Sequence, residues 1–144
     1  MPARITPVTH GVTHGTTEIG PFRLTETSHG PHTRLERHRH AHPAVTFVLR
    51  GRFLEDFGSG RHHDCGVMSV LVKPADAAHT NRYSSDGARS FILECESSST
   101  YAPALDAFAP RFGLARFAVR MLELHTAFRA RAPEQRVLAE EIVL

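Results

Sequence analysis

A row of histidines is the part of this sequence best suited to chemistry. His38, His40 and His42 alternate with other residues just before Val45 to Leu49, a β-branched and aromatic run typical of a packed strand. Because side chains on an extended strand point alternately to opposite faces, the three imidazoles would lie on one side. Such a row predicts either a metal site or the polar lining of a ligand pocket.

Another histidine, His79, follows Pro74 by five residues, after a second strand-like run. Together with His38, His40 and Gly51, these residues fall on the positions of the two motifs of the cupin superfamily, which the chain resembles. The resemblance implies a small antiparallel β-barrel, or jelly roll. It also implies that the motif histidines face into the barrel and hold a divalent metal.

The motifs differ from the family pattern at two positions. Ala44 stands where the family has a metal-binding Glu, and Asp76 stands where it has a Gly. The resemblance therefore leaves three metal ligands, His38, His40 and His79, which suit Zn, Fe, Ni or Cu. The alternative is that the lost Glu means a lost metal, so that the same histidines line a pocket for an organic ligand.

Several other polar residues on predicted strands could reach the barrel interior. Glu55 and Glu94 are candidate replacements for the missing carboxylate, although exposed strand carboxylates are commoner. Thr46 and Tyr83 could line a pocket. The predicted ligand-binding residues are His38, His40, His42, Thr46, Glu55, His79 and Tyr83. For His42 the alternative is that a bend near Pro43 turns it outward.

Length and composition exclude several classes of protein. With 144 residues the chain suits one domain, and 17 basic against 15 acidic residues give a net charge of +2, which predicts no face for binding a polyanion. No apolar run is long enough to span a membrane. Only Cys65 and Cys95 are present, without an apolar secretory segment, so we expect a reducing, cytoplasmic location.

Short strands separated by turn residues predict a mainly β fold, an antiparallel sandwich or barrel over residues 21–97. Residues 1–20 have little apolar periodicity and predict a flexible amino-terminal arm. Gly51-Arg52 and Asp86-Gly87 read as hairpin connections, and His62-His63 as part of an exposed loop. The predicted strands are 22–26, 34–49, 53–57, 67–72, 79–83 and 90–96.

Residues 98–144 predict a carboxy-terminal helical segment. One apolar stripe should dock on the barrel, a second helix should begin near Pro133, and remaining apolar surface should serve as a dimer contact. The helical pattern is still open at Leu144, which predicts that the chain is a fragment. The stripes are Leu114, Phe117, Met121, Leu124 or His125, and Phe128, then Val137, Leu138 and Ile142.

The order of these features resembles the sensor domain of AraC-type transcription regulators. The resemblance rests on the cupin motifs, on Leu49, Gly51, Phe53 and Glu55 ending a buried strand, and on the Asp-Gly-Ala-Arg run at 86–89. It implies a small-molecule effector inside the barrel and a homodimer formed through the helices. DNA would be bound only through helix-turn-helix units that are absent from this chain.

Two other functions compete with a sensing and dimerisation domain. A metal-dependent cupin enzyme, a dioxygenase or an isomerase, would use the three-histidine site, with Glu55 as the candidate general base. No second catalytic group is evident, so we assign no catalytic residue. A storage or scaffold cupin would fill its barrel with apolar side chains, which the polar histidine row argues against.

Overall fold

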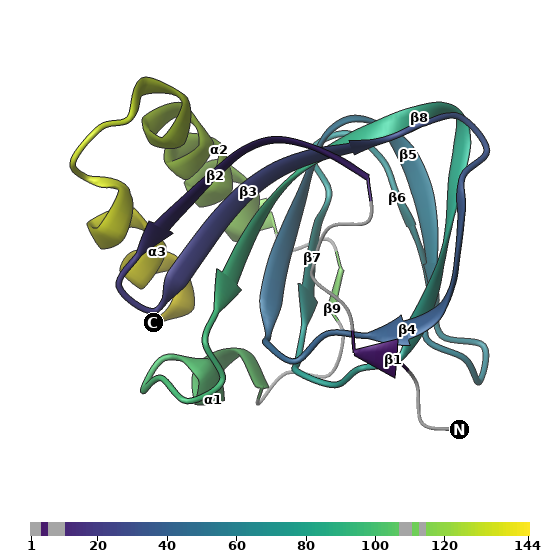
Figure 1. The fold of residues 1–144 in the computed structure, drawn as a ribbon, viewed down its shortest axis with the longest axis horizontal. Helices are drawn as coiled ribbons and strands as arrows, with labels where there is room; N and C mark the ends of the chain where they lie inside the picture. The colour runs from purple at the N-terminus through teal and green to yellow at the C-terminus, as the bar shows by residue number, and fades with distance from the viewer. Residues whose placement is uncertain (1–3, 6–10, 107–110, 113–114) are drawn as a thin grey trace.

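The computed structural model describes residues 4–5, 11–106, 111–112 and 115–144. Within these residues the chain forms nine strands in one mostly antiparallel sheet and three helices, so the predicted mainly β fold with carboxy-terminal helices is confirmed. In Figure 1 the sheet curls round an interior, and α2 and α3 lie on one side of it. The elements are β1 (Arg4–Ile5), β2 (Val12–Ile19), β3 (Phe22–His29), β4 (Arg34–Arg39), β5 (Ala44–Asp56), β6 (His62–Cys65), β7 (Val70–Lys73), β8 (His79–Cys95), α1 (Ala102–Asp106), β9 (Arg111–Phe112), α2 (Ala115–Ala130) and α3 (Gln135–Val143).

Two long strands, β5 and β8, form the centre of the sheet. They pair antiparallel from Ala44 opposite Glu94 to Asp56 opposite Thr80. The predicted hairpins at Gly51-Arg52 and Asp86-Gly87, which would divide each strand in two, were wrong. Gly51 and Gly87 do have positive φ angles, 76° and 65°, but they lie at irregularities within continuous strands. A β-bulge uses the same glycine conformation as a tight turn, so the sequence signal is shared.

The irregularity around Gly51 changes which residues of β5 face the interior. Before it, Thr46 faces the inner cavity, while Val45 and Phe47 belong to the core under the helices. After it, the odd-numbered Phe53 and Glu55 face the cavity. An extra residue in one strand reverses the alternation of the side chains. The bulge therefore brings Glu55 into the same space as Thr46.

The outer face of the sheet carries the main apolar core, which the helices cover. Phe47 and Phe91 pack in one cluster with Met121, Leu124 and Phe128 of α2, all of them buried. This confirms that the predicted stripe docks on the barrel; its first residue, Leu114, lies outside the described residues. The second stripe was partly wrong, because Val137 is 56% exposed, whereas Ile142 is buried.

The amino-terminal part differs from the irregular arm expected over 1–20. Val12–Ile19 forms β2, which pairs antiparallel with β3. Most β2 side chains are exposed, so the strand shows no apolar alternation that would reveal it in the sequence. The rest of the expected arm, apart from β1, Gly11 and Gly20, lies outside the described residues.

The expected loop around His62-His63 is also a strand, β6, which pairs with the end of β5. Its side chains are mostly polar, so composition alone indicated a loop. None of the helices that the structure describes has the length and apolarity needed to cross a lipid bilayer.

Candidate metal centre

The three predicted metal ligands come together inside the barrel. His38, on β4, lies directly opposite His79, at the start of β8, and His40 follows shortly after β4 ends. Their ligand nitrogens all lie within 4.8 Å of one another, and all three side chains are buried. Two segments that are about 40 residues apart in the sequence thus supply one compact imidazole cluster.

Backbone carbonyls hold two of these rings in a defined tautomer. The Nδ1 atom of His38 lies 2.6 Å from the carbonyl oxygen of Glu36, and Nδ1 of His79 lies 2.8 Å from that of Ala77. Because a carbonyl can only accept, each Nδ1 carries the proton, and in the neutral ring Nε2 keeps its lone pair. Metal-binding histidines are usually oriented in this way.

Electrostatics also keep His38 neutral. Burial lowers the pKa of His38, and the nearby Lys73 ammonium lowers it further, against the opposing effects of the Glu36 carbonyl and the Glu55 carboxylate. A neutral imidazole is the form that binds a metal ion. The ring is therefore ready to act as a ligand near neutral pH.

A buried carboxylate lies beside the histidines. The Oε1 atom of Glu55 is 3.5 Å from Nε2 of His79, and it accepts hydrogen bonds from Lys73 Nζ at 3.0 Å and Asn81 Nδ2 at 2.9 Å. Its other oxygen, Oε2, is buried with no hydrogen-bond partner in the described part of the chain. A buried oxygen of this kind normally binds water or an ion. The three imidazoles therefore fit a divalent cation, and the Glu55 carboxylate lies beside them, next to His79.

The space inside the barrel is small. The cavity has a volume of about 30 Å³, which is room for one ion or one water molecule. Pockets for organic ligands are typically about 300–1,000 Å³. The cavity is lined by Thr27, His29, Leu35, His38, His40, Thr46, Phe53, Glu55, Lys73, His79, Asn81, Tyr83, Ser90 and Ile92.

Six of the seven predicted ligand-binding residues line this cavity, and His42 does not. Its Nδ1 accepts a hydrogen bond from the Ser97 backbone at 3.0 Å. The expected row of three imidazoles required a continuous strand, but β4 ends at Arg39, so the alternation stops before His42. The alternative carboxylate Glu94 is buried but does not line the cavity either.

Five polar residues that line the cavity were not predicted: Thr27, His29, Lys73, Asn81 and Ser90. Lys73 and Asn81 are the two that contact Glu55. Asn81 could have been found, because it lies two residues after His79 and two before Tyr83 on one face of a strand. Lys73 is the only lysine of the chain and directly precedes the motif Pro74. In the β5–β7 pair Lys73 lies opposite Ala44, at the other end of β5 from Glu55, so its contact with Glu55 depends on the closure of the barrel, which no local pattern encodes.

Comparisons with known proteins give likenesses in structure only. No family model matches the chain, and no curated protein matches it. The AraC-like transcriptional activator CuxR has a TM-score of 0.70 at 12% identity, over 89% of this chain and 51% of that chain. A cupin superfamily protein from Desulfitobacterium hafniense has a TM-score of 0.52 at 14% identity, over 67% of this chain and 84% of that chain.

Oxalate decarboxylase from Bacillus subtilis matches with a TM-score of 0.45 at 18% identity, over 56% of this chain and 22% of that chain. The chain thus spans about half of the activator and less than a quarter of the decarboxylase. At these identities, the likenesses to the activator and to the cupin superfamily protein show the fold: the chain has a cupin fold, as the histidine motifs predicted.

Proposed function

We propose that this chain is the sensing and dimerisation domain of an AraC-type transcription regulator, with a divalent metal ion bound inside its barrel. The observation that carries the regulator proposal is the extent of the likeness to the AraC-like activator. Residues 1–97 are 97 of the 144, about two thirds, so a match over 89% includes part of the helical segment. A likeness to the cupin barrel alone would not extend into the helical segment.

In this proposal His38, His40 and His79 hold the metal, and the Glu55 carboxylate lies within its reach. A bound Zn, Fe, Ni or Cu ion would cross-link these side chains and act as a Lewis acid. The chain's own residues orient the site: carbonyls fix the tautomers of His38 and His79, and Lys73 and Asn81 hold Glu55 in place.

An ion suits the interior better than an organic effector does. The cavity of about 30 Å³ would have to open several-fold before a small organic molecule could enter the barrel. The effector that this geometry supports inside the barrel is therefore the ion itself. A homodimer partner and DNA contacts made by another part of a longer protein complete the proposal.

Metal analysis tests the site. Protein purified without a His tag should retain, or take up after dialysis, about one divalent ion per chain, and His79→Ala should lose it. His62→Ala is the matched control, because His62 is an exposed histidine outside the cluster. His40→Ala repeats the test if His79→Ala fails to fold, as judged by circular dichroism. Wild-type protein that binds none of Zn, Fe, Ni or Cu contradicts the metal proposal.

The regulator part is tested by the effect of the ion on assembly. We expect sedimentation to show a dimer whose stability changes when a chelator removes the metal. An unchanged, monomeric species in both states would contradict a metal-sensing dimer.

A metal-dependent enzyme is the second candidate, and Glu55 favours it. A buried carboxylate with one unpartnered oxygen beside the histidines could serve as a general base. Glu55→Gln distinguishes the two functions. Turnover of an organic substrate or of oxygen by the metal-loaded protein, lost in Glu55→Gln at unchanged metal content, would replace the sensor proposal with an enzyme.

A further inference from the structure

Outside the barrel, three adjoining depressions lie where the outer face of the sheet meets α2. Their volumes are about 610, 370 and 340 Å³. The 610 and 370 Å³ depressions share Arg50 and Arg89. The 370 and 340 Å³ depressions share Glu26 and Arg129. They therefore form one continuous groove, which we call the anion groove and define by Glu26, Arg50, Arg89, His125 and Arg129.

In the anion groove, charged side chains stand at positions that are apolar further along the same strands. Glu26 and Arg89 continue the rows of Leu24 on β3 and Phe91 on β8 that face the helices. The Glu26 carboxylate is buried, and its Oε1 accepts a hydrogen bond from His125 Nε2 at 2.5 Å. Its Oε2 accepts from Arg89 Nε at 2.6 Å and lies 3.5 Å from Arg129 Nη1.

Glu26 is the single negative charge in this part of the groove. Burial alone would raise the pKa of Glu26, but the hydrogen bonds from His125 and Arg89 outweigh it and lower the pKa. Against this one carboxylate stand the three guanidinium groups of Arg50, Arg89 and Arg129. Three positive charges and one negative charge leave +2 when His125 is neutral.

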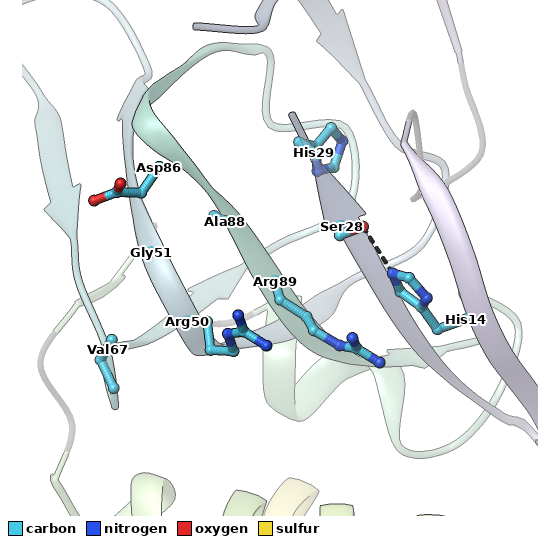
Figure 2. A pocket seen from close by; sticks show the side chains of 9 residues that line it. All are labelled: His14, Ser28, His29, Arg50, Gly51, Val67, Asp86, Ala88 and Arg89. Carbon is cyan, nitrogen blue, oxygen red and sulfur yellow. Dashed lines mark hydrogen bonds between the residues drawn. The ribbon is translucent and has the colours of Figure 1, made fainter. Parts of the chain in front are cut away.

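Of the three arginines in the groove, Arg50 is the one that forms no ion pair within the described residues. It lies directly opposite Arg89 across the β5–β8 pair, where like charges repel. In Figure 2 the Arg89 side chain extends away from Arg50 toward β3, where it pairs with Glu26, while Asp86 points away from both arginines. Within the described residues Arg50 makes no hydrogen bond or ion pair, and its side chain is exposed. Arg89 is already paired with Glu26, so the positive charge left for a further anion is that of Arg50.

We propose that the anion groove binds a small organic phosphate. The planar guanidinium fork matches phosphate oxygens, and a phosphate monoester dianion balances a charge of +2, which a monocarboxylate does not. Arg50 reaches the ligand from the sheet and Arg129, 62% exposed, from α2. The space beyond the arginines, with the polar side chains of His14 and Ser28 at its edge, accommodates the organic group.

The five residues that define the groove are separate from the metal centre, because none of them lines the barrel cavity. The largest depression adjoins that cavity at His29, which lines both. A phosphate held between Arg50 and Arg129 would connect β5 to α2, so it would join the barrel to the helical segment. Anion binding in the groove therefore does not require a metal ion in the barrel.

Titration calorimetry with phenyl phosphate tests the groove, using the full chain at constant ionic strength in the presence of a chelator. We expect saturable binding that weakens roughly tenfold or more in Arg50→Ala and in Arg129→Ala. Arg52→Ala is the matched control and should bind like wild type, because Arg52 is an exposed arginine of the same strand paired with Asp64 outside the groove.

Three outcomes would overturn the proposal. These are no saturable binding at millimolar phenyl phosphate, equal weakening in all three variants, and equal affinity for benzoate, a monocarboxylate of similar shape. Because the chelator removes any metal, each outcome leaves the metal centre to be decided by its own experiment. All three arginines have exposed side chains, so folded variants are expected, and circular dichroism checks this.

Discussion

Single buried residues decide the polarity of the barrel interior. Glu55 accepts hydrogen bonds from both Lys73 and Asn81 and lies beside His79, so one carboxylate contacts three polar side chains. A buried charge of this kind is tolerated only when it is paired and hydrogen-bonded. The interior is therefore held by polar contacts rather than by apolar packing alone, which fits a binding site better than a scaffold barrel.

Glu94 gives a prediction on pH dependence at the same scale. Burial raises the pKa of Glu94, although His42 and Arg23 pull it down in part. An unfolded Glu ionises near pH 4.3, so just above this pH the folded chain holds a proton that the unfolded chain releases. The stability conferred by neutral Glu94 is therefore present below that pH and is lost as the pH rises through the folded pKa.

We accordingly expect Glu94→Gln to be more stable than wild type at pH 7 and to lose this advantage near pH 4. Urea denaturation at the two pH values measures the difference. Glu96→Gln, at an exposed neighbour, serves as the control and should change neither value. A Glu94→Gln variant that is less stable than wild type at pH 7 would show that the ionised carboxylate is satisfied in the folded protein.

At the scale of elements, the close approach of β5 and β8 depends on two glycines. A Cβ at Gly51 would lie 2.0 Å from the carbonyl oxygen of Gly87, and both residues have positive φ angles. The strands could not approach so closely with larger residues. The irregularity at Gly51 also reverses the side-chain alternation of β5, so that Glu55 faces the barrel interior.

Gly51→Ala should therefore destabilise the fold strongly, by more than about 3 kcal/mol in the free energy of unfolding. Gly60→Ala is a matched control, because Gly60 has a similar φ of 75° but nothing within 4 Å of its Cβ position. Backbone strain alone should cost that variant about 1–2 kcal/mol. Equal losses in the two variants would mean that the clash with Gly87 is relieved at no cost.

At the scale of the whole molecule, the helices present apolar side chains on the surface away from the sheet. Val119 and Leu122 of α2 are 59% and 44% exposed, and three residues apart they lie on one helix face. Exposed apolar residues that cluster on one face are typical of a protein–protein contact. They are the candidate dimer surface of the proposed regulator domain.

Leu122→Asp should raise the dimer dissociation constant at least roughly tenfold, since it places a charge in an apolar contact. Sedimentation equilibrium measures the change. Val67→Asp is the control, because Val67 is also an exposed apolar residue, at 59%, but lies in the turn before β7. A dimer weakened equally by both substitutions, or by neither, would place the contact elsewhere.

Local pattern was enough to predict a mainly β fold and the docking stripe of α2, and the resemblance to the cupin motifs added the cupin fold and the three histidines of the candidate site. These depend on side-chain alternation, helical periodicity and motif spacing, which the order of residues encodes directly. Alternation also explains why the row could be placed on one face as far as His40. His42 leaves the row because β4 ends at Arg39 and the chain bends just before Pro43, a residue that disfavours a continuous strand.

Only the tertiary structure decided how distant residues combine. The glycine signals at 51 and 87 suit a hairpin and a bulge equally, and strand pairing selected the bulge. The net charge of +2 concealed a groove where three arginines surround one glutamate, because composition does not record which charges become neighbours. Likewise, Glu55 met Lys73, Asn81 and His79 only once β5, β7 and β8 lay side by side, since contacts between strands depend on the register of the sheet and on no local pattern.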